Sequence, residues 1–136
     1  MNNSEFFMKE EGMEPLSVVL VWNETDQTSV EKYIQYTTKM LSRDINRPFS
    51  RTINLPIFYY SNSEGNEVPM LPKLKSEKIL IYVFIGINNA SSDKWGDYVE
   101  SLYDIENAKI VPIALDKYAY KVSDKVQNYN FIREYE

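Results

Sequence analysis

Apolar residues in this chain gather in short runs that alternate with segments of polar and helically spaced residues. Residues 79–85, ILIYVFI, are apolar at odd and even positions alike. A strand that is apolar on both faces must be covered on both faces, which is typical of a central strand in a parallel sheet. Residues 16–22 and 109–115 form similar runs and predict two more strands of the same sheet.

Between the first strand and the next the pattern predicts a helix. Thr28 or Ser29 is expected to cap it, and apolar residues at helical spacing extend it to about Arg43. A short strand over residues 56–60, PIFYY, comes later in the chain. In the polar cluster after that strand, Gly65 is the residue expected to take a positive φ in a turn.

A further helix is expected to begin at Asp93. Trp95, Tyr98, Val99 and Leu102 recur at the spacing of one helical face. The first interpretation of Trp95 is therefore that it packs in the core. A platform for a ligand is the alternative.

The remaining segments predict shorter elements. Two prolines bracket residues 69–72, which leaves room for one turn of helix. Pro112 lacks an amide hydrogen, so one side of the strand at residues 109–115 is expected to be unpaired or bulged. Residues 118–126 predict a short helix, and residues 129–133 predict a fifth strand.

This order of strands and helices predicts a three-layer α/β fold with a five-stranded, mainly parallel sheet. Five strands favour the flavodoxin-like strand order 2-1-3-4-5. We expect residues 1–15 to form an N-terminal arm and residues 16–136 to form a single domain. A fold of this class normally adds a last helix over the fifth strand. The chain is therefore expected to be a fragment of a longer protein, or to receive that cover from another chain.

The composition of the chain limits the catalytic groups, metal sites and partners that it can have. The 136 residues suffice for one domain with a core, and the net charge of −5 argues against a binder of nucleic acids or anionic membranes. The chain has no cysteine and no histidine, which removes Cys nucleophiles, His bases and Cys/His zinc sites. Only a hard cation bound by oxygens would remain, and no metal or cofactor is expected. No apolar run approaches the roughly 20 residues that span a bilayer, and the lack of cysteine fits a cytoplasmic protein.

The loop at residues 86–93 is the first candidate for a binding site. It follows the central strand, and in open sheets of this kind ligands sit beyond the carboxyl ends of the strands. Its amides and hydroxyls, Asn88 among them, suit a ribose or the edge of a neutral base. The alternative is that Ser92 or Asp93 only caps the helix that follows. The four glycines of the chain form no Rossmann or P-loop motif.

Glu24 and Asp26 follow the first strand, as the acidic pair of phosphoacceptor receiver domains does. Those domains also need an aspartate at the end of the third strand, where this chain has Ile85, Gly86 and Ile87. A receiver domain is therefore disfavoured. The two acids belong either to a solvated turn that favours the helix N-terminus or to the rim of a binding site.

Four segments together resemble the bacterial TIR-like (Toll/interleukin-1 receptor-like) domains. They are VVLVW before a polar turn and a long helix, LPIFYYS before VPMLPKL, KILIYVFIGINNASSDKWGDYVESL, and KIVPIALD. The resemblance extends over residues 16–116. It implies a five-stranded parallel sheet and a role as an effector or signalling domain in prokaryotic immunity or conflict.

The resemblance also implies a chemistry. Many bacterial TIR domains hydrolyse NAD and release nicotinamide without a metal, using a glutamate in the helix that begins near this tryptophan. One carboxylate suffices, because it can orient the ribose and stabilise an oxocarbenium-like centre. In the family that glutamate commonly falls four residues after the tryptophan, where this chain has Val99, and Glu100 comes one residue later. Glu100 is the first candidate for the catalytic carboxylate and Asp97 the second, and a solvated surface carboxylate is the alternative for both.

The leading hypothesis is a TIR-like domain that cleaves NAD, its substrate, when the domain is assembled. The resemblance implies a pocket between the first and third strands that is lined by Asn23, Tyr60, Ser61, Asn88 and Trp95. Self-association and the other domains of a longer chain are the expected partners. The alternatives are a non-catalytic protein–protein association module and a nucleotide sensor that binds without turnover.

Overall fold

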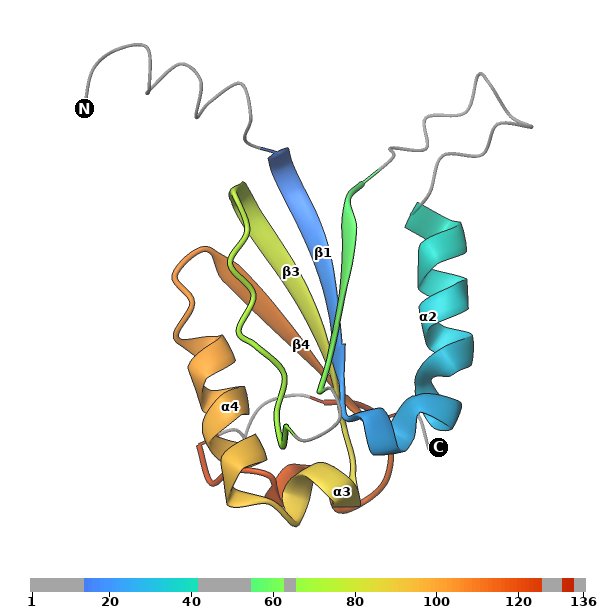
Figure 1. The fold of residues 1–136 in the computed structure, drawn as a ribbon, viewed down its shortest axis with the longest axis vertical. Helices are drawn as coiled ribbons and strands as arrows, with labels where there is room; N and C mark the ends of the chain where they lie inside the picture. Colours follow the sequence, from blue (N-terminus) through green and yellow to red (C-terminus); the bar gives the residue numbers. More distant parts are fainter. Residues whose placement is uncertain (1–13, 42–54, 63–65, 126–130, 134–136) are drawn as a thin grey trace.

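The structure is a computed structural model that describes residues 14–41, 55–62, 66–125 and 131–133 (Figure 1). Several predicted features lie outside these ranges. They are almost all of the arm at residues 1–15, the end of the first helix at Arg43, the turn at Gly65 and the first two residues of the predicted fifth strand.

Five parallel strands form one sheet in the order β2-β1-β3-β4-β5, which confirms the predicted fold class (Figure 1). The strands are β1 (Glu14–Trp22), β2 (Ile57–Ser61), β3 (Ser76–Ile85), β4 (Ala108–Ala114) and β5 (Ile132–Arg133). β3 lies in the middle, where Ile81 is opposite Val19 of β1 and Ile110 of β4. β3 is apolar on both faces because each face of the sheet packs against another layer of the fold.

The backbone nitrogen of Pro112 has no hydrogen to donate, and it faces the side of β4 where no hydrogen bond to β3 is lost. The Leu115 amide donates to the Ile85 carbonyl at 2.8 Å, so odd-numbered residues at this end of β4 direct their backbone groups towards β3. Pro112 therefore directs its backbone away from β3. On that side β5 pairs with β4 only at Ile113 and Ala114. The predicted unpaired position is confirmed for the described part of the sheet.

One long helix lies on each face of the sheet (Figure 1). α2 (Gln27–Leu41) covers one face, and α4 (Asp93–Tyr103) covers the other. The predicted cap of the first helix is wrong, because a 3-10 turn, η1 (Glu24–Asp26), runs directly into α2. The side chain of Asn23 starts that turn by accepting a hydrogen bond from the Thr25 amide at 3.0 Å. The predicted cap of α4 is confirmed, since the hydroxyl of Ser92 accepts a hydrogen bond from the Trp95 amide.

Three predictions for the connecting segments need correction. The loop at residues 86–93 contains a short helix, α3 (Ile87–Ala90), because the Gly86 carbonyl accepts hydrogen bonds from the amides of Asn89 and Ala90 at 3.0 Å. Residues 69–72 form no helical turn and belong to an extended connector, in which prolines remove two of the amides that a turn needs. Residues 118–126 form only the 3-10 turn η2 (Ala119–Lys121) within the described range.

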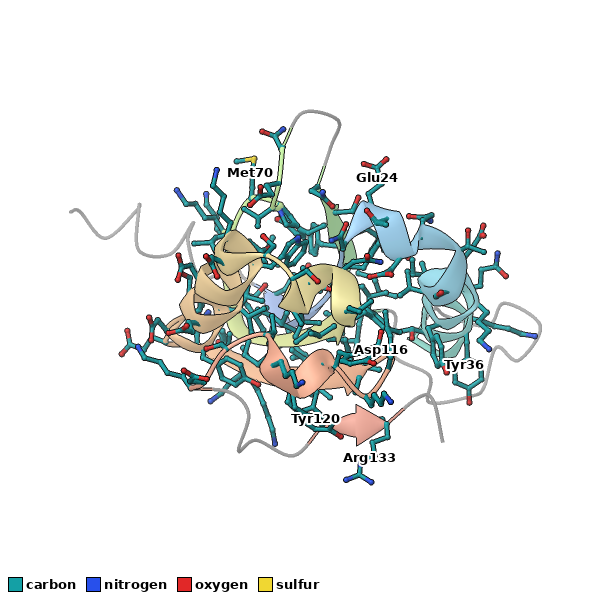
Figure 2. All side chains as sticks on the ribbon, turned by 90° about the horizontal axis from the view of Figure 1, so that it is seen from below. Glu24, Tyr36, Met70, Asp116, Tyr120 and Arg133 are labelled. Carbon is teal, nitrogen blue, oxygen red and sulfur yellow. The ribbon has the colours of Figure 1, made fainter. Side chains whose placement is uncertain are left out.

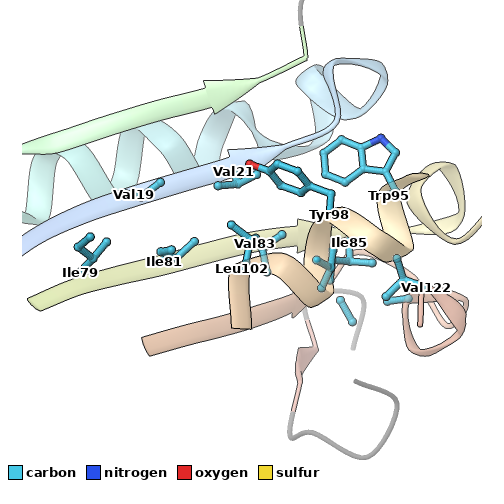
Figure 3. Packing of buried hydrophobic residues seen from close by; sticks show 13 residues of the cluster. Val19, Val21, Ile79, Ile81, Val83, Ile85, Trp95, Tyr98, Leu102 and Val122 are labelled. Carbon is cyan, nitrogen blue, oxygen red and sulfur yellow. The ribbon is translucent and has the colours of Figure 1, made fainter. Parts of the chain in front are cut away.

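The larger core lies between the sheet and α4. Figure 3 shows Trp95, Tyr98 and Leu102 of α4 over the side chains of β1 and β3. Val99 is also fully buried in this cluster, so the four residues predicted to share a helical face all face the core. Each of these large side chains stabilises the fold by about 1.5–3 kcal/mol on burial.

A smaller core lies between the sheet and α2. Its buried members are Leu20, Trp22, Val30, Phe84 and Ile113. Tyr33 of α2 packs against Phe84 at a ring distance of 5.9 Å. α2 is the only described helix on this face (Figure 1).

Candidate functional site

The segments that follow the first four strands are joined by hydrogen bonds at the carboxyl end of the sheet. The Glu24 amide donates to Asn62 Oδ1 at 2.7 Å, which joins the segments after β1 and β2. Asn88 Nδ2 donates to Asp26 Oδ1 at 2.9 Å, which joins the segments after β1 and β3. We call these residues, together with Asn89 and Asp116, the carboxyl rim. Figure 2 views it from below, with Glu24 and Asp116 on opposite sides of α3.

Asp116 fixes the position of α3 against the segment after β4. Its Oδ2 accepts a hydrogen bond from the Ile87 amide at 2.9 Å, and its Oδ1 accepts one from the Tyr118 amide at 2.9 Å. Gly86 makes this approach feasible, because a Cβ there would lie 2.9 Å from Asp116 Oδ2. The carboxylate of Asp116 thus holds the N-terminus of α3, where a negative charge is favourable.

Three buried polar atoms near this rim have no hydrogen-bond partner among the described residues. They are Asp26 Oδ2, Asn89 Nδ2 and Trp95 Nε1. Asn89 and Trp95 have exposed fractions of 0% and 1%. Buried polar atoms in proteins are nearly always paired with protein, water or ligand. One acceptor and two donors near the carboxyl end of the sheet are therefore unpaired within the described residues, although Asn89 and Trp95 are shielded from solvent.

The carboxyl group of Asp26 is electrostatically perturbed. Burial raises its pKa above the ordinary value of 3.8, the hydrogen bond from Asn88 lowers it in part, and the nearby charge of Asp116 raises it. Perturbed carboxyl groups at the ends of parallel strands are frequent at functional sites. This favours the interpretation of Asp26 as part of a rim over that of a freely solvated turn.

The predicted ligand-binding residues lie in three places. Asn88 belongs to the carboxyl rim, and Asn23 directly precedes the first rim residue, Glu24, where it is buried and its amide oxygen caps η1. Trp95 is buried in the core, where its ring meets that of Tyr98 edge-on at 5.3 Å. Tyr60 and Ser61 lie at the outer strand β2 instead.

Tyr60 and Ser61 line a hollow of about 510 Å³ beside β2. The opposite wall is the connector that leads to β3, with Val68 and Met70 facing the hollow. We call this space the β2 hollow. Its lining includes the polar residues Ser61 and Asn66 and contains no residue of the carboxyl rim.

The two candidate catalytic carboxylates of α4 do not lie in the β2 hollow. Glu100 accepts a hydrogen bond from Ser123 Oγ at 2.7 Å and forms an ion pair with Lys125 at 3.2 Å. The hydroxyl of Ser123 and then Lys125 hold the pKa of Glu100 below its usual range. Tyr98, about 200° around the helix from Glu100, donates to the Met70 carbonyl at 2.9 Å. Glu100 therefore lies on the opposite flank from the hollow, and Asp97 is exposed.

Three residues of the carboxyl rim, Asn62, Asn89 and Asp116, were not among the individual site residues predicted from the sequence. Asp116 directly follows the predicted fourth strand, and this position is a usable signal, because the carboxyl ends of parallel strands meet at one edge. Asn89 lies in the loop at residues 86–93 that was predicted as a candidate binding site, but it was not singled out. Its burial results from α3, which the sequence did not predict.

Comparisons of the chain with protein-family models, with curated proteins and with solved structures find no match. The TIR-like resemblance therefore stays a prediction. In the part of the chain that the structure describes, no helix is both long and apolar enough to cross a membrane. The described residues also contain no group of three or more acidic side chains placed to hold a metal ion.

Proposed function

We propose that this chain is a TIR-like signalling domain of a prokaryotic defence or conflict system that binds a nucleotide at its carboxyl rim. One observation carries the proposal. The buried atoms Asp26 Oδ2, Asn89 Nδ2 and Trp95 Nε1 have no hydrogen-bond partner among the described residues, and all belong to segments at the carboxyl end of the sheet. The expected partners are the other domains of a longer cytoplasmic protein and further copies of this chain.

The chemistry of these atoms suits a nucleoside. A carboxylate accepts hydrogen bonds from ribose hydroxyls, while the amide of Asn89 and the indole of Trp95 donate to carbonyl or phosphate oxygens. The carboxylates of α4 take no part in this mode of binding. Nicotinamide dinucleotides contain all three kinds of group and are the first ligands to test.

Titration calorimetry with NAD tests the binding proposal. We expect saturable binding by the wild type and a loss of at least about tenfold in affinity, about 1.4 kcal/mol, for Asp26→Asn. Glu24→Gln is the matched control, because it neutralises an exposed acid beside Asp26 whose backbone amide, not its side chain, bonds to the rim. Absence of binding by the wild type, or equal affinity in all three proteins, would reject the proposal.

Hydrolysis of NAD is the second candidate function. The observation in its favour is that Ser123 and Lys125 hold the side chain of Glu100 in place and lower its pKa, and a carboxylate is the group that stabilisation of an oxocarbenium-like centre requires. Release of nicotinamide at high protein concentration is the measurement. Catalysis by Glu100 predicts that turnover disappears in Glu100→Gln and persists in Asp97→Asn. Turnover lost only in Asp97→Asn would assign the role to Asp97 instead.

A further inference from the structure

β2 is a border strand of the sheet that the described residues form. β2 pairs with β1 on one side only, and the Val18 amide donates to the Pro56 carbonyl at 2.9 Å. Backbone groups of alternate residues point to opposite sides of a strand, so Phe58 and Tyr60 also point towards β1. The amides and carbonyls of Ile57, Tyr59 and Ser61 therefore point outward. They have no backbone partner within the described residues.

Within the described residues, β2 itself carries none of the usual protection against pairing with another strand, although Pro56 directly precedes it. Natural edge strands carry charges, inward-pointing lysines, prolines or bulges. Between Arg51 and Glu64 this chain has no charged residue, although 26% of its residues are charged. Phe58 and Tyr59 expose 38% and 45% of their surface. The hydroxyl of Tyr59 is hydrogen-bonded to Thr38 of α2, which holds its ring on the α2 face.

We propose that β2 pairs with β2 of a second copy of this chain, antiparallel and around a twofold axis at Tyr59. In this register Tyr59 is opposite Tyr59 of the second copy, and Ile57 is opposite Ser61. The outward-pointing residues then form the hydrogen-bonded pairs, each of which exchanges two backbone bonds. Each copy has a net charge of −5, and an edge without charged side chains lets two copies approach there without local charge repulsion.

The side chains of the two copies are complementary in the same register. Phe58 lies opposite Tyr60 of the second copy, on the α4 face, because both are in register with Val19 and Val21 of β1. Tyr60 lines the β2 hollow of about 510 Å³, whose other wall contains Met70. Each copy thus offers one exposed phenylalanine and one hollow to the other. A twofold interface requires self-complementarity of this kind, and aromatic pairs across strands stabilise it further.

Sedimentation velocity across a concentration series tests the proposal. We expect a reversible dimer for the wild type. Ile57→Pro removes an outward amide and no bond to β1, and Phe58→Glu places a charge at the pairing edge; each is expected to weaken dimerisation at least about tenfold. Tyr36→Glu is the control, because Tyr36 is 65% exposed on α2 and lies away from this edge (Figure 2). Circular dichroism checks that each variant is folded.

A cross-linking experiment tests the register itself. The chain has no cysteine, so single replacements report one position each. In Tyr59→Cys the two sulfurs meet at the axis, where the Cα atoms are about 5.5 Å apart, within the range of a disulfide. In Ile57→Cys they are separated by about 14 Å along the strands. We expect oxidation to give a covalent dimer of Tyr59→Cys and little of Ile57→Cys.

Several outcomes would overturn this interface. They are a wild type that stays monomeric at every concentration, variants that dimerise as well as the wild type, and equal cross-linking at positions 57 and 59. A monomer that instead binds a neutral extended peptide would assign the edge to a different partner. Asp26 is not part of β2, so Asp26→Asn is expected to leave dimerisation unchanged. The test of this interface is therefore independent of the test of nucleotide binding.

Discussion

Asp26 illustrates at the scale of one residue what the sequence leaves open. From its place after an apolar run it belongs either to a solvated turn or to a rim, and both are compatible with the residues around it. The three-dimensional neighbours decide, because Asn88 and Asp116 come from segments after other strands. A carboxyl group kept partly buried beside a like charge costs stability, which is common at sites retained for function.

We predict that Asp26→Asn changes stability in a pH-dependent way. The folded protein binds the proton of Asp26 more tightly than the unfolded chain does, because its pKa is raised above 3.8. The free energy of unfolding of the wild type therefore falls as the pH rises above about 3.8 and through the raised pKa, because the partly buried carboxyl group ionises. The neutral amide lacks this contribution. We expect the stability of the variant relative to the wild type to be greater at neutral pH than at about pH 3.

Urea unfolding at the two pH values is the measurement. The comparison at about pH 3 serves as the control, because the carboxyl group of the wild type is then largely protonated and close to the amide in charge. A difference between the two proteins that is constant with pH would contradict the assigned perturbation of Asp26.

At the scale of elements, prediction succeeded where a local signal was strong. α4 begins at Asp93 with Ser92 as its cap, as expected from a polar residue before a helical apolar pattern. α3 escaped prediction because four residues carry no periodicity. Its first amide is held by Asp116, a residue 29 positions away in the chain.

We predict that Ser92→Ala lowers the free energy of unfolding by about 1 kcal/mol. The variant loses the bond from the Trp95 amide at the start of α4 and the bond from Ser92 Oγ to Glu67 in the connector, at 3.1 Å. Denaturant unfolding monitored by circular dichroism measures the change.

Ser91→Ala is the matched control for this variant. The Ser91 hydroxyl bonds only within α3, to the Ile87 carbonyl at 2.7 Å, and the residue is exposed. Its loss is expected to be clearly smaller than that of Ser92→Ala. Equal losses would show that the cap of α4 contributes nothing of its own.

At the scale of the whole molecule, the strand order was predictable because five strands that alternate with helices favour the flavodoxin-like order, and apolar runs on both faces indicate which strands lie inside the sheet. The candidate site was less predictable. The flank of α4 on which Glu100 lies depends on one residue of helical phase and on the partners Ser123 and Lys125. Neither partner is recognisable from local pattern.

We predict an uneven distribution of hydrogen-exchange protection across the sheet. Amides of β1 and β3 are expected to exchange most slowly, since both strands are paired on two sides and residues such as Val19 and Ile81 are fully buried. β5 pairs with β4 at only two positions, and Ile132 is 53% exposed. Its amides are expected to exchange fastest among the strands. Equal protection of β5 and β3 would contradict this gradient.

The carboxylate of Asp116 connects two segments of the chain through one hydrogen bond at each oxygen. One oxygen holds the start of α3, and the other holds Tyr118 at the entrance to η2. η2 leads within a few residues to Ser123 and Lys125, which hold Glu100. α3 also contacts η2 and α4 directly, so a displacement of α3 is expected to reach the surroundings of Glu100 through these contacts as well as through the carboxylate of Asp116.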